Sequence, residues 1–276
     1  MNGMKTGWLL YDRGDYEVNR LFAEHIQKKA EPIGLSIQVV LTETLRFEDA
    51  DLPDFVISRQ RNHRLSQAFE QAGIPVFNSS RVCKICNDKR NTHRFLEGFP
   101  QMKTVFIDAE HPNSPQSLPF PLVVKPATGH GGDRVSLVEN ESQLQAALAD
   151  FANEPALLQE LASNAGRDLR VYVLFGHIVA GVMRTARSGI VSNFKRGGDV
   201  ALHTLTDAEA ALAQAVIRRF EEQGAPLSFA GIDFLYHNGN PVMNEVEDVV
   251  GSRMLYQVSD IDIIDLYIIE IARRLS

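Results

Sequence analysis

The stretch FAGIDFLYHNGNPVMNEVE, residues 229–247, contains the features that decide the fold of the second half of this chain. Two largely apolar runs flank a turn centred on Gly239, which is the pattern of a β-hairpin. Asp233 and Glu245 are equidistant from Gly239, so a three-residue loop places them directly opposite each other, with side chains on one face. Glu247, two residues beyond Glu245, joins the same face. The hairpin therefore predicts three carboxylates close together on one side of a sheet.

Three crowded carboxylates repel one another unless a cation neutralises them. Hard oxygen ligands of this kind suit magnesium or manganese, so the pattern predicts a metal site at Asp233, Glu245 and Glu247. An exposed acidic sheet face is the alternative. A two-residue turn at Asn238 and Gly239 would shift the register by one residue and split the carboxylates between two faces. The metal prediction therefore depends on the length of the loop.

A glycine-rich loop upstream indicates phosphate binding. Lys125 ends the apolar run Leu122–Lys125, and Thr128-Gly129-His130-Gly131-Gly132 follows it. Glycines allow backbone N–H groups to approach phosphate oxygens closely. The loop lacks the Gly-Lys-Ser/Thr of a Walker A motif and the spacing of GxGxxG, so a simple hairpin turn explains it about as well. Lys89, in Asn87-Asp88-Lys89, is a second phosphate candidate or a surface lysine at a helix start.

The first 80 residues alternate between strand and helix patterns, with helical spacing after the first and third of four strand-like runs. These runs are Thr6–Tyr11, Leu35–Leu41, Phe55–Ile57 and Ile74–Phe77. This order predicts a small doubly wound module with a parallel sheet, whose ligands bind beyond the carboxyl ends of the strands. Asp12 with Arg13, and Arg59 with Arg61 and Asn62, follow predicted strands. They can hold a substrate there or lie as solvated loop charges.

The second half is different in kind, because its strand patterns pair as hairpins. Leu169–Phe175 and His177–Thr185 are joined by a turn at Gly176, and helical spacing covers about Asp207 to Gln223. A long apolar-faced helix ends the chain. We therefore expect an α/β module followed by an α+β half that is dominated by antiparallel pairs.

Length and composition limit the function classes. The chain has 276 residues, of which 44% are hydrophobic and 23% charged, as in a globular protein with two or three packed modules. Its net charge of −7 argues against a general nucleic-acid or anionic-membrane binder. The segment from Arg59 to Arg94 nevertheless carries eight basic residues against two acidic ones, which predicts contact with an anion.

Several partner classes are not expected. The apolar run Trp8–Tyr11 is too short for a signal peptide, and Val171–Met183 is shorter than the roughly 20 residues of a membrane span. We expect a cytoplasmic protein without membrane or nucleic-acid partners, and the oligomeric state, a homo-oligomer included, stays open. Cys83 and Cys86 form a lone CxxC with only His93 near in sequence, so ordinary reduced thiols are favoured over a metal or redox site.

These motifs, in this order, resemble the ATP-grasp superfamily, and most closely its RimK-like branch of carboxylate-amine ligases, which includes alpha-L-glutamate ligases. The resemblance covers nearly the whole chain and is strongest from Asn78 onward. No single motif is decisive, but a triphosphate site needs such groups from separate elements, and their shared order carries the resemblance. The matching pieces are Cys86-Asn87-Asp88-Lys89, Val124-Lys125-Pro126, Leu158-Gln159-Glu160, Gly166-Arg167-Asp168-Leu169-Arg170, Ser192-Asn193-Phe194-Lys195-Arg196-Gly197-Gly198, Ala230-Gly231-Ile232-Asp233 and Asn244-Glu245-Val246-Glu247.

The resemblance implies an ATP-grasp fold in three parts. An N-terminal pre-ATP-grasp module (1–82) would precede a small subdomain with the glycine-rich loop (83–158) and a C-terminal subdomain with the metal carboxylates (159–276). The implied enzyme uses ATP and magnesium, or manganese, to form an amide or peptide bond through an acyl phosphate, releasing ADP and phosphate. The alternative is a regulatory or scaffold protein of the same fold that binds ATP without ligating.

The resemblance also implies roles for single residues. Lys89, Lys125 and the loop residues Thr128, Gly129, Gly131 and Gly132 would meet the nucleotide phosphates. The hinge of Gln159, Glu160 and Leu161 would bind adenine, and Asp168 the ribose. Arg170, Arg184 and Asn193 would face the γ-phosphate and the acyl group, while Asp233, Glu245 and Glu247 would hold two magnesium ions.

One departure from the family concerns Glu247, where RimK-like enzymes usually have asparagine followed by small residues and a proline. Two like charges about 4 Å apart repel by about 4 kcal/mol at an effective dielectric of about 20, and a further cation contact offsets this. The altered segment Gly251–Tyr256 lies where the acceptor would bind. Arg253 therefore joins Arg59, Arg61 and Asn62 as a candidate substrate residue. Glu247 and this segment are also the features that favour the scaffold alternative.

Overall fold

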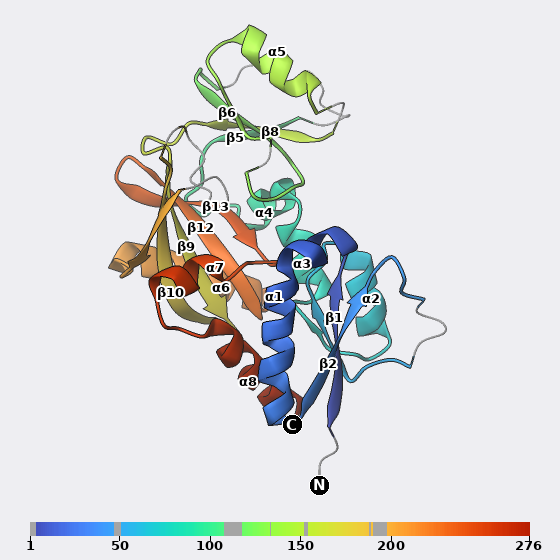
Figure 1. The fold of residues 1–276 in the computed structure, drawn as a ribbon. Helices are drawn as coiled ribbons and strands as arrows, with labels where there is room; N and C mark the ends of the chain where they lie inside the picture. The colour runs from blue at the N-terminus through green and yellow to red at the C-terminus, as the bar shows by residue number, and fades with distance from the viewer. Residues whose placement is uncertain are drawn as a thin grey trace.

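The computed structural model describes residues 4–46, 51–107, 118–132, 134–151, 154–187, 189 and 198–276. Its strands form an N-terminal, a small and a central sheet. In Figure 1 the small sheet lies at the top, the central sheet below it, and the N-terminal sheet beside the central sheet. The N-terminal sheet contains β1 (Lys5–Tyr11), β2 (Leu35–Leu41), β3 (Phe55–Ser58) and β4 (Val76–Phe77). The small sheet contains β5 (Thr104–Ile107), β6 (Leu122–Pro126), β7 (Ser136–Val138) and β8 (Ala156–Glu160). The central sheet contains β9 (Arg167–Leu174), β10 (His177–Thr185), β11 (Asp199–His203), β12 (Phe229–His237) and β13 (Asn240–Glu247).

The N-terminal sheet confirms the predicted parallel, doubly wound module. Its strands are all parallel in the order β2-β1-β3-β4. Helix α1 (Arg13–Ala30) buries Ala23 and Ile26 against one face, and α2 (His63–Gln71) buries Phe69 against the other. A 3-10 turn, Glu31–Ile33, links α1 to β2. Asp12 caps α1 by accepting a hydrogen bond from the Asp15 N–H at 2.8 Å, so it is explained by helix capping.

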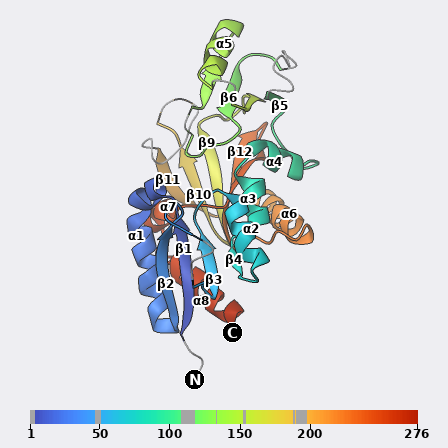
Figure 2. The same cartoon turned by 90° about the vertical axis from the view of Figure 1, so that its right-hand side faces the viewer.

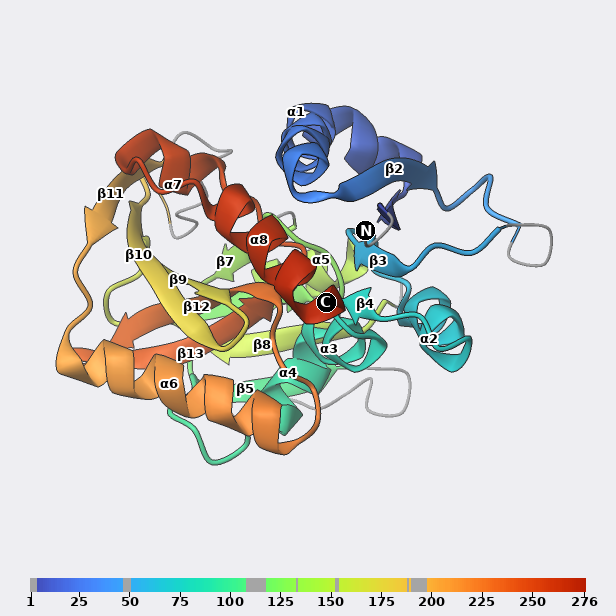
Figure 3. The same ribbon diagram turned by 90° about the horizontal axis from the view of Figure 1, so that it is seen from below.

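The central sheet is antiparallel, in the order β11-β10-β9-β12-β13, and helices cover both of its faces. Helix α6 (Asp207–Glu222) packs on one face, against side chains such as Val171 and Val173. Helix α8 (Ile263–Leu275) packs on the other face and shares one apolar cluster with α1 and the N-terminal sheet. Figure 3 shows α8 between the central sheet and α1. This shared cluster joins the N-terminal module to the C-terminal half.

The two helices that lie between the N-terminal and small sheets in sequence pack against the central sheet. α3 (Ser80–Cys86) contributes Val82 and Ile85 to the cluster around α6, and Phe95 of α4 (Lys89–Phe95) packs against it, on the same side of the central sheet in Figure 2. The small sheet is antiparallel, in the order β5-β8-β6-β7, and α5 (Glu141–Ala149) covers it. The division at residues 82 and 158 stays a prediction. The N-terminal and central sheets lie within its first and third parts, but α3 runs across residue 82 and β8 runs across residue 158.

Two further features of the described residues bear on the predictions. No described helix is long and apolar enough to cross a membrane. Cys83 and Cys86 lie on α3 as free thiols, and burial raises the pKa of both. A raised pKa lowers the thiolate fraction, so these cysteines have the character of packing residues.

The predicted three-residue loop of the β12–β13 hairpin is wrong, yet Asp233 and Glu245 still pair. The turn has two residues, Asn238 and Gly239, both at positive φ, and His237 pairs with Asn240. This register alone would place Asp233 opposite Asn244. A β-bulge between the pairs Phe234–Met243 and Asp233–Glu245 inserts one extra residue, and the register shifts back by one. The short turn and the bulge compensate for each other.

Candidate active site

A cavity of about 240 Å³ is lined by residues of the small sheet, the central sheet, α1 and α7 (Arg253–Val258). Most of the residues singled out from the sequence line it, although they come from separate parts of the chain. They are Arg59, Arg61, Lys89, Lys125, Gly129, Gly131, Gly132, Gln159, Glu160, Leu161, Asp168, Arg170, Arg184, Glu245, Glu247 and Arg253. A concave site with convergent charged groups is the default candidate for an active site.

Three of the described residues that the resemblance or the strand ends assigned to the site, Asp233, Thr128 and Asn62, do not line the cavity. Asp233 is completely buried, and Thr128 is exposed. Asn62 caps α2, where its side chain accepts a hydrogen bond from the Arg64 N–H at 3.1 Å. Helix capping therefore explains Asn62, and a polar residue after a strand looks the same in sequence for either role. Asn193, with most of its motif, lies outside the described residues.

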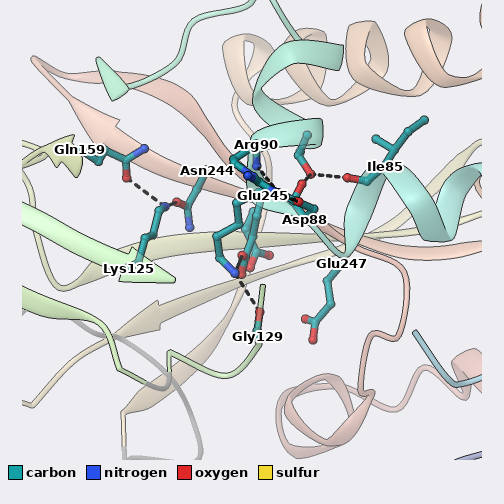
Figure 4. A network of polar contacts seen from close by, with 12 residues as sticks. Ile85, Asp88, Arg90, Lys125, Gly129, Gln159, Asn244, Glu245 and Glu247 are labelled. Carbon is teal, nitrogen blue, oxygen red and sulfur yellow. Dashed lines mark hydrogen bonds and ion pairs between the residues drawn. The ribbon is translucent and has the colours of Figure 1, made fainter. Parts of the chain in front are cut away.

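The two candidate phosphate lysines lie within the cavity on different elements. Lys125, near the end of β6, is buried, and its ammonium donates to Gln159 Oε1 at 3.1 Å and to Asn244 Oδ1 at 3.2 Å (Figure 4). Lys89, at the start of α4, donates to the carbonyl of Gly129 at 2.8 Å. Burial lowers the pKa of Lys125 to about 8, with the Glu245 charge opposing and the Lys89 charge adding to the shift. Lys125 is thus a desolvated cation whose charge is available near neutral pH.

The buried carboxylate Asp233 is neutralised by two guanidinium groups. Arg170, its neighbour on β9, donates to it through Nε at 2.8 Å and Nη2 at 2.7 Å, and Arg184 donates through Nη2 at 2.7 Å. Arg184 also pairs with Asp168. Burial raises the pKa of Asp233, but the two arginine charges outweigh burial and lower it to about 2. Asp233 is therefore balanced by two arginines, whereas the sequence predicted a metal ion beside it.

Glu245 and Glu247 are the hairpin carboxylates that reach the cavity. Glu245 Oε2 lies 3.9 Å from Lys89 Nζ, and Glu247 Oε2 lies 2.5 Å from Arg170 Nη2. Among the residues that the structure describes, no three acidic, His or Cys side chains are grouped to hold a metal ion. Two partly exposed carboxylates still fit magnesium, which takes one or two protein carboxylates and completes its shell with phosphate oxygens and water. The donor set therefore suits a metal that arrives with a nucleotide.

The end of the cavity near α1 carries the candidate substrate arginines. Arg61 forms an ion pair with Asp15 of α1, and Arg253 is exposed at the start of α7. Arg59 is buried, stacks 4.5 Å above the Phe22 ring and donates to the Val250 carbonyl at 2.9 Å. Arg61 and Arg253 therefore present charge to the cavity, while Arg59 also anchors the segment after Glu247.

The predicted hinge and ribose residues also have partners within the protein. Gln159 faces inward and holds Lys125, while the Glu160 N–H donates to the Lys103 carbonyl at 2.9 Å. Asp168, the candidate ribose residue, lines the cavity in its ion pair with Arg184. Any nucleotide contact by Asp168 would therefore be made next to a fixed guanidinium.

Asp15, Asn19, Asn244 and Met254 also line the cavity, although the sequence analysis assigned them no role. Asp15 lies one turn into α1, and the helix period could have placed it beyond the strand end together with Asp12. Asn244 could not have been found in this way, because in a regular strand it and Glu245 would point to opposite faces.

Both the sequence and the fold of this chain match known proteins. Residues 96–271 match the family model described as RimK-like ATP-grasp domain. A probable alpha-L-glutamate ligase of Sodalis glossinidius (strain morsitans) is 32% identical over 219 residues, covering 75% of this chain and 72% of the relative. The uncharacterized protein MG011 of Mycoplasma genitalium is 26% identical over 256 residues, covering 91% of this chain and 86% of the relative.

Solved structures agree with these sequence matches at the level of the fold. The D-alanine–D-alanine ligase of Bacillus anthracis, complexed with ATP, superposes with a TM-score of 0.76 and 16% identity, covering 99% of this chain and 98% of that one. The D-cycloserine synthetase DcsG superposes with a TM-score of 0.73 and 15% identity, covering 98% of this chain and all of that one. The likeness spans all three sheets, the N-terminal module included.

Proposed function

The chain belongs to the RimK-like ATP-grasp family, and from this premise we propose that it joins a carboxylate to an amine while ATP is converted to ADP and phosphate. The family consists of ATP-dependent carboxylate-amine ligases, so the chain is an enzyme of this class. The observation that supports the reaction is one cavity that combines the cations Lys89 and Lys125 with the carboxylates Glu245 and Glu247. Phosphoryl transfer to a carboxylate needs charge neutralisation more than covalent help, and this set of groups supplies it.

The proposed reaction has two steps. A carboxylate oxygen of the first substrate attacks the γ-phosphorus of ATP, the bond to the β-phosphate oxygen breaks, and ADP leaves. The amine nitrogen of the second substrate then attacks the acyl carbon of the acyl phosphate. Phosphate leaves from the tetrahedral intermediate, the nitrogen loses a proton, and the amide remains.

We assign the residues to these steps by their place in the cavity. Lys89, Lys125 and the glycine-rich loop bind the phosphates. Glu245 and Glu247 would hold magnesium, which neutralises phosphate charge when it is bound. Arg184, fixed by Asp168 and Asp233, is a preorganised cation for the oxyanion of the tetrahedral intermediate.

We place the carboxylate substrate at the end of the cavity formed by α1 and α7. Arg61 and Arg253 supply guanidinium groups there, and guanidinium pairs bidentately with carboxylates. The alternative role as an ATP-binding scaffold is favoured by Glu247, whose carboxylate is paired with Arg170. The cytoplasmic location predicted from the sequence is compatible with a reaction that uses ATP.

ADP release with pairs of amino acids and short peptides tests this function. We expect ADP release to require a carboxylate and an amine together, and a coupled assay over a matrix of such pairs measures this. Hydroxylamine in place of the amine should trap the acyl phosphate as a hydroxamate. ATP binding without ADP release for every pair would instead support the scaffold alternative.

The Lys125→Ala variant tests the phosphate contact. ATP with magnesium should raise the melting temperature of the parent more than adenosine does, because adenosine lacks the phosphates that Lys125 would contact. A ligand at about 100 times its Kd stabilises the folded protein by about 2.7 kcal/mol, so the tighter ligand gives the larger shift at equal concentration. Lys125→Ala should remove most of this difference, while the exposed Lys103→Ala should keep it. Since the pKa of Lys125 is about 8, its charge is present below that pH, and the advantage of ATP should shrink as the pH rises above it. Equal shifts for ATP and adenosine in the parent would contradict the contact.

A further inference from the structure

We propose that Asn244 is a positioning residue that holds the Lys125 ammonium in place for the nucleotide phosphates. The inference rests on the proposed function, because it gives Lys125 a phosphate to bind. It goes beyond that function by assigning a role to the extra residue of the β13 bulge.

The bulge turns Asn244 into the cavity. Successive residues of a regular strand point to opposite faces, so Asn244 and Glu245 would be separated. In β13, Asp233 pairs with Glu245 and Phe234 with Met243, which leaves Asn244 as the inserted residue. Asn244 and Glu245 consequently both line the cavity, while Met243 and Val246 remain in the apolar cluster under α6. Bulges are common beside active sites, where they redirect a side chain in this way.

The redirected amide reaches across the cavity to the small sheet. Asn244 Oδ1 accepts from Lys125 Nζ at 3.2 Å, although the two residues are 119 positions apart in sequence. Gln159 Oε1 accepts from the same ammonium at 3.1 Å, and Gln159 Nε2 donates to Thr104 Oγ1 at 2.9 Å. The ammonium is therefore held by Gln159 of the small sheet and Asn244 of the central sheet, as Figure 4 shows.

The chemistry of the two partners suits a phosphate-binding lysine. Both acceptors are neutral amide oxygens, so they orient the ammonium without cancelling its charge. An ammonium has three N–H donors, and these bonds use two of them, which leaves one for a phosphate oxygen. A carboxylate at position 244 would neutralise Lys125 and repel the triphosphate.

A double-mutant cycle tests whether Asn244 acts through Lys125. The affinities of ATP with magnesium and of adenosine are measured by calorimetry for the parent, Asn244→Ala, Lys125→Ala and the double variant. Asn244→Ala should weaken ATP binding about 10-fold, the order expected for a lost hydrogen bond to a charged group, and leave adenosine binding unchanged. In the Lys125→Ala background the same change should have an effect of less than about 2-fold, because interacting residues are not additive.

Two further variants make the outcome specific. Asn244→Asp should weaken ATP binding more than Asn244→Ala does, because it adds a charge beside Lys125, while Asn240→Ala, exposed in the turn of the same strand, should match the parent. An equal loss from Asn244→Ala with and without Lys125, or parent-like binding by Asn244→Asp, overturns the inference and leaves Asn244 as a structural bulge residue. If Lys125→Ala alone keeps full ATP affinity, Lys125 does not bind the phosphates, and both the proposed contact and the inference fail. This result differs from the failure of the inference alone, in which Lys125→Ala weakens ATP binding but Asn244→Ala does not act through Lys125.

Discussion

The Glu245→Gln variant is expected to release ADP with a kcat about 10²- to 10³-fold below that of the parent, the loss typical of one preorganised electrostatic group. Glu245 lines the cavity and lies 3.9 Å from the Lys89 ammonium. Glutamine keeps the shape and one oxygen ligand, so the loss reports the missing charge. Initial rates at saturating ATP and magnesium measure it, with Glu222→Gln on the exposed side of α6 as the matched control.

Glu247→Asn is the informative companion to this variant, because it restores the residue that the family usually has. It keeps an oxygen ligand and removes a charge that is now balanced by Arg170 at 2.5 Å. We expect retained activity with a higher magnesium requirement, since one anionic contact to the metal is gone. Titrating magnesium against ADP release compares the two variants with the parent. Parent-like rates for both at every magnesium concentration would leave Glu245 and Glu247 as surface carboxylates and defeat the metal assignment.

The positions of many strands were accessible from the sequence, because hydrophobic periodicity reflects which residues of a strand are buried. The pattern of Leu35–Leu41 predicts β2 with the observed bounds, and the hairpin around Gly176 follows from two apolar runs joined by a glycine. Register was less accessible. The pairing of Asp233 with Glu245 was predicted from a three-residue loop, and it arises instead from a two-residue turn and a bulge. Nothing local in the β13 sequence distinguishes these two solutions.

The sequence predicted which residues line the cavity better than it predicted which of them pair with one another. Motif order collected Lys125, Asp168 and Glu245 from three separate strands, and the cavity contains all of them. The pairing of each cation with a carboxylate depends on how strands that are far apart in sequence pack together in space. Arg170 and Asp233, for example, are 63 positions apart. Arg59 shows the same limit, because its bond to the Val250 carbonyl joins residues 191 positions apart.

The Asp233→Asn variant is expected to lower the free energy of unfolding by roughly 3–5 kcal/mol, as when one partner of a buried ion pair is removed. The variant leaves Arg170 and Arg184 buried with one fewer negative charge between them, and both guanidinium groups lose charge-assisted bonds. Urea unfolding at pH 7 measures the effect, and Asp260→Asn, which changes an exposed aspartate, should stay within about 0.5 kcal/mol of the parent.

The pH dependence of this difference separates the ion pair from simple packing. The pKa of Asp233 falls from an ordinary 3.8 to about 2 in the folded protein. A carboxyl whose pKa is lowered by folding stabilises the protein above its unfolded value and loses that contribution as the pH falls through the folded value. The gap between the parent and Asp233→Asn should therefore be full above about pH 5 and narrow towards pH 2. A gap that is constant over this range would mean that the substitution destabilises the protein through the shape of the new side chain, and that arginine pairing is not what holds the carboxylate in the sheet.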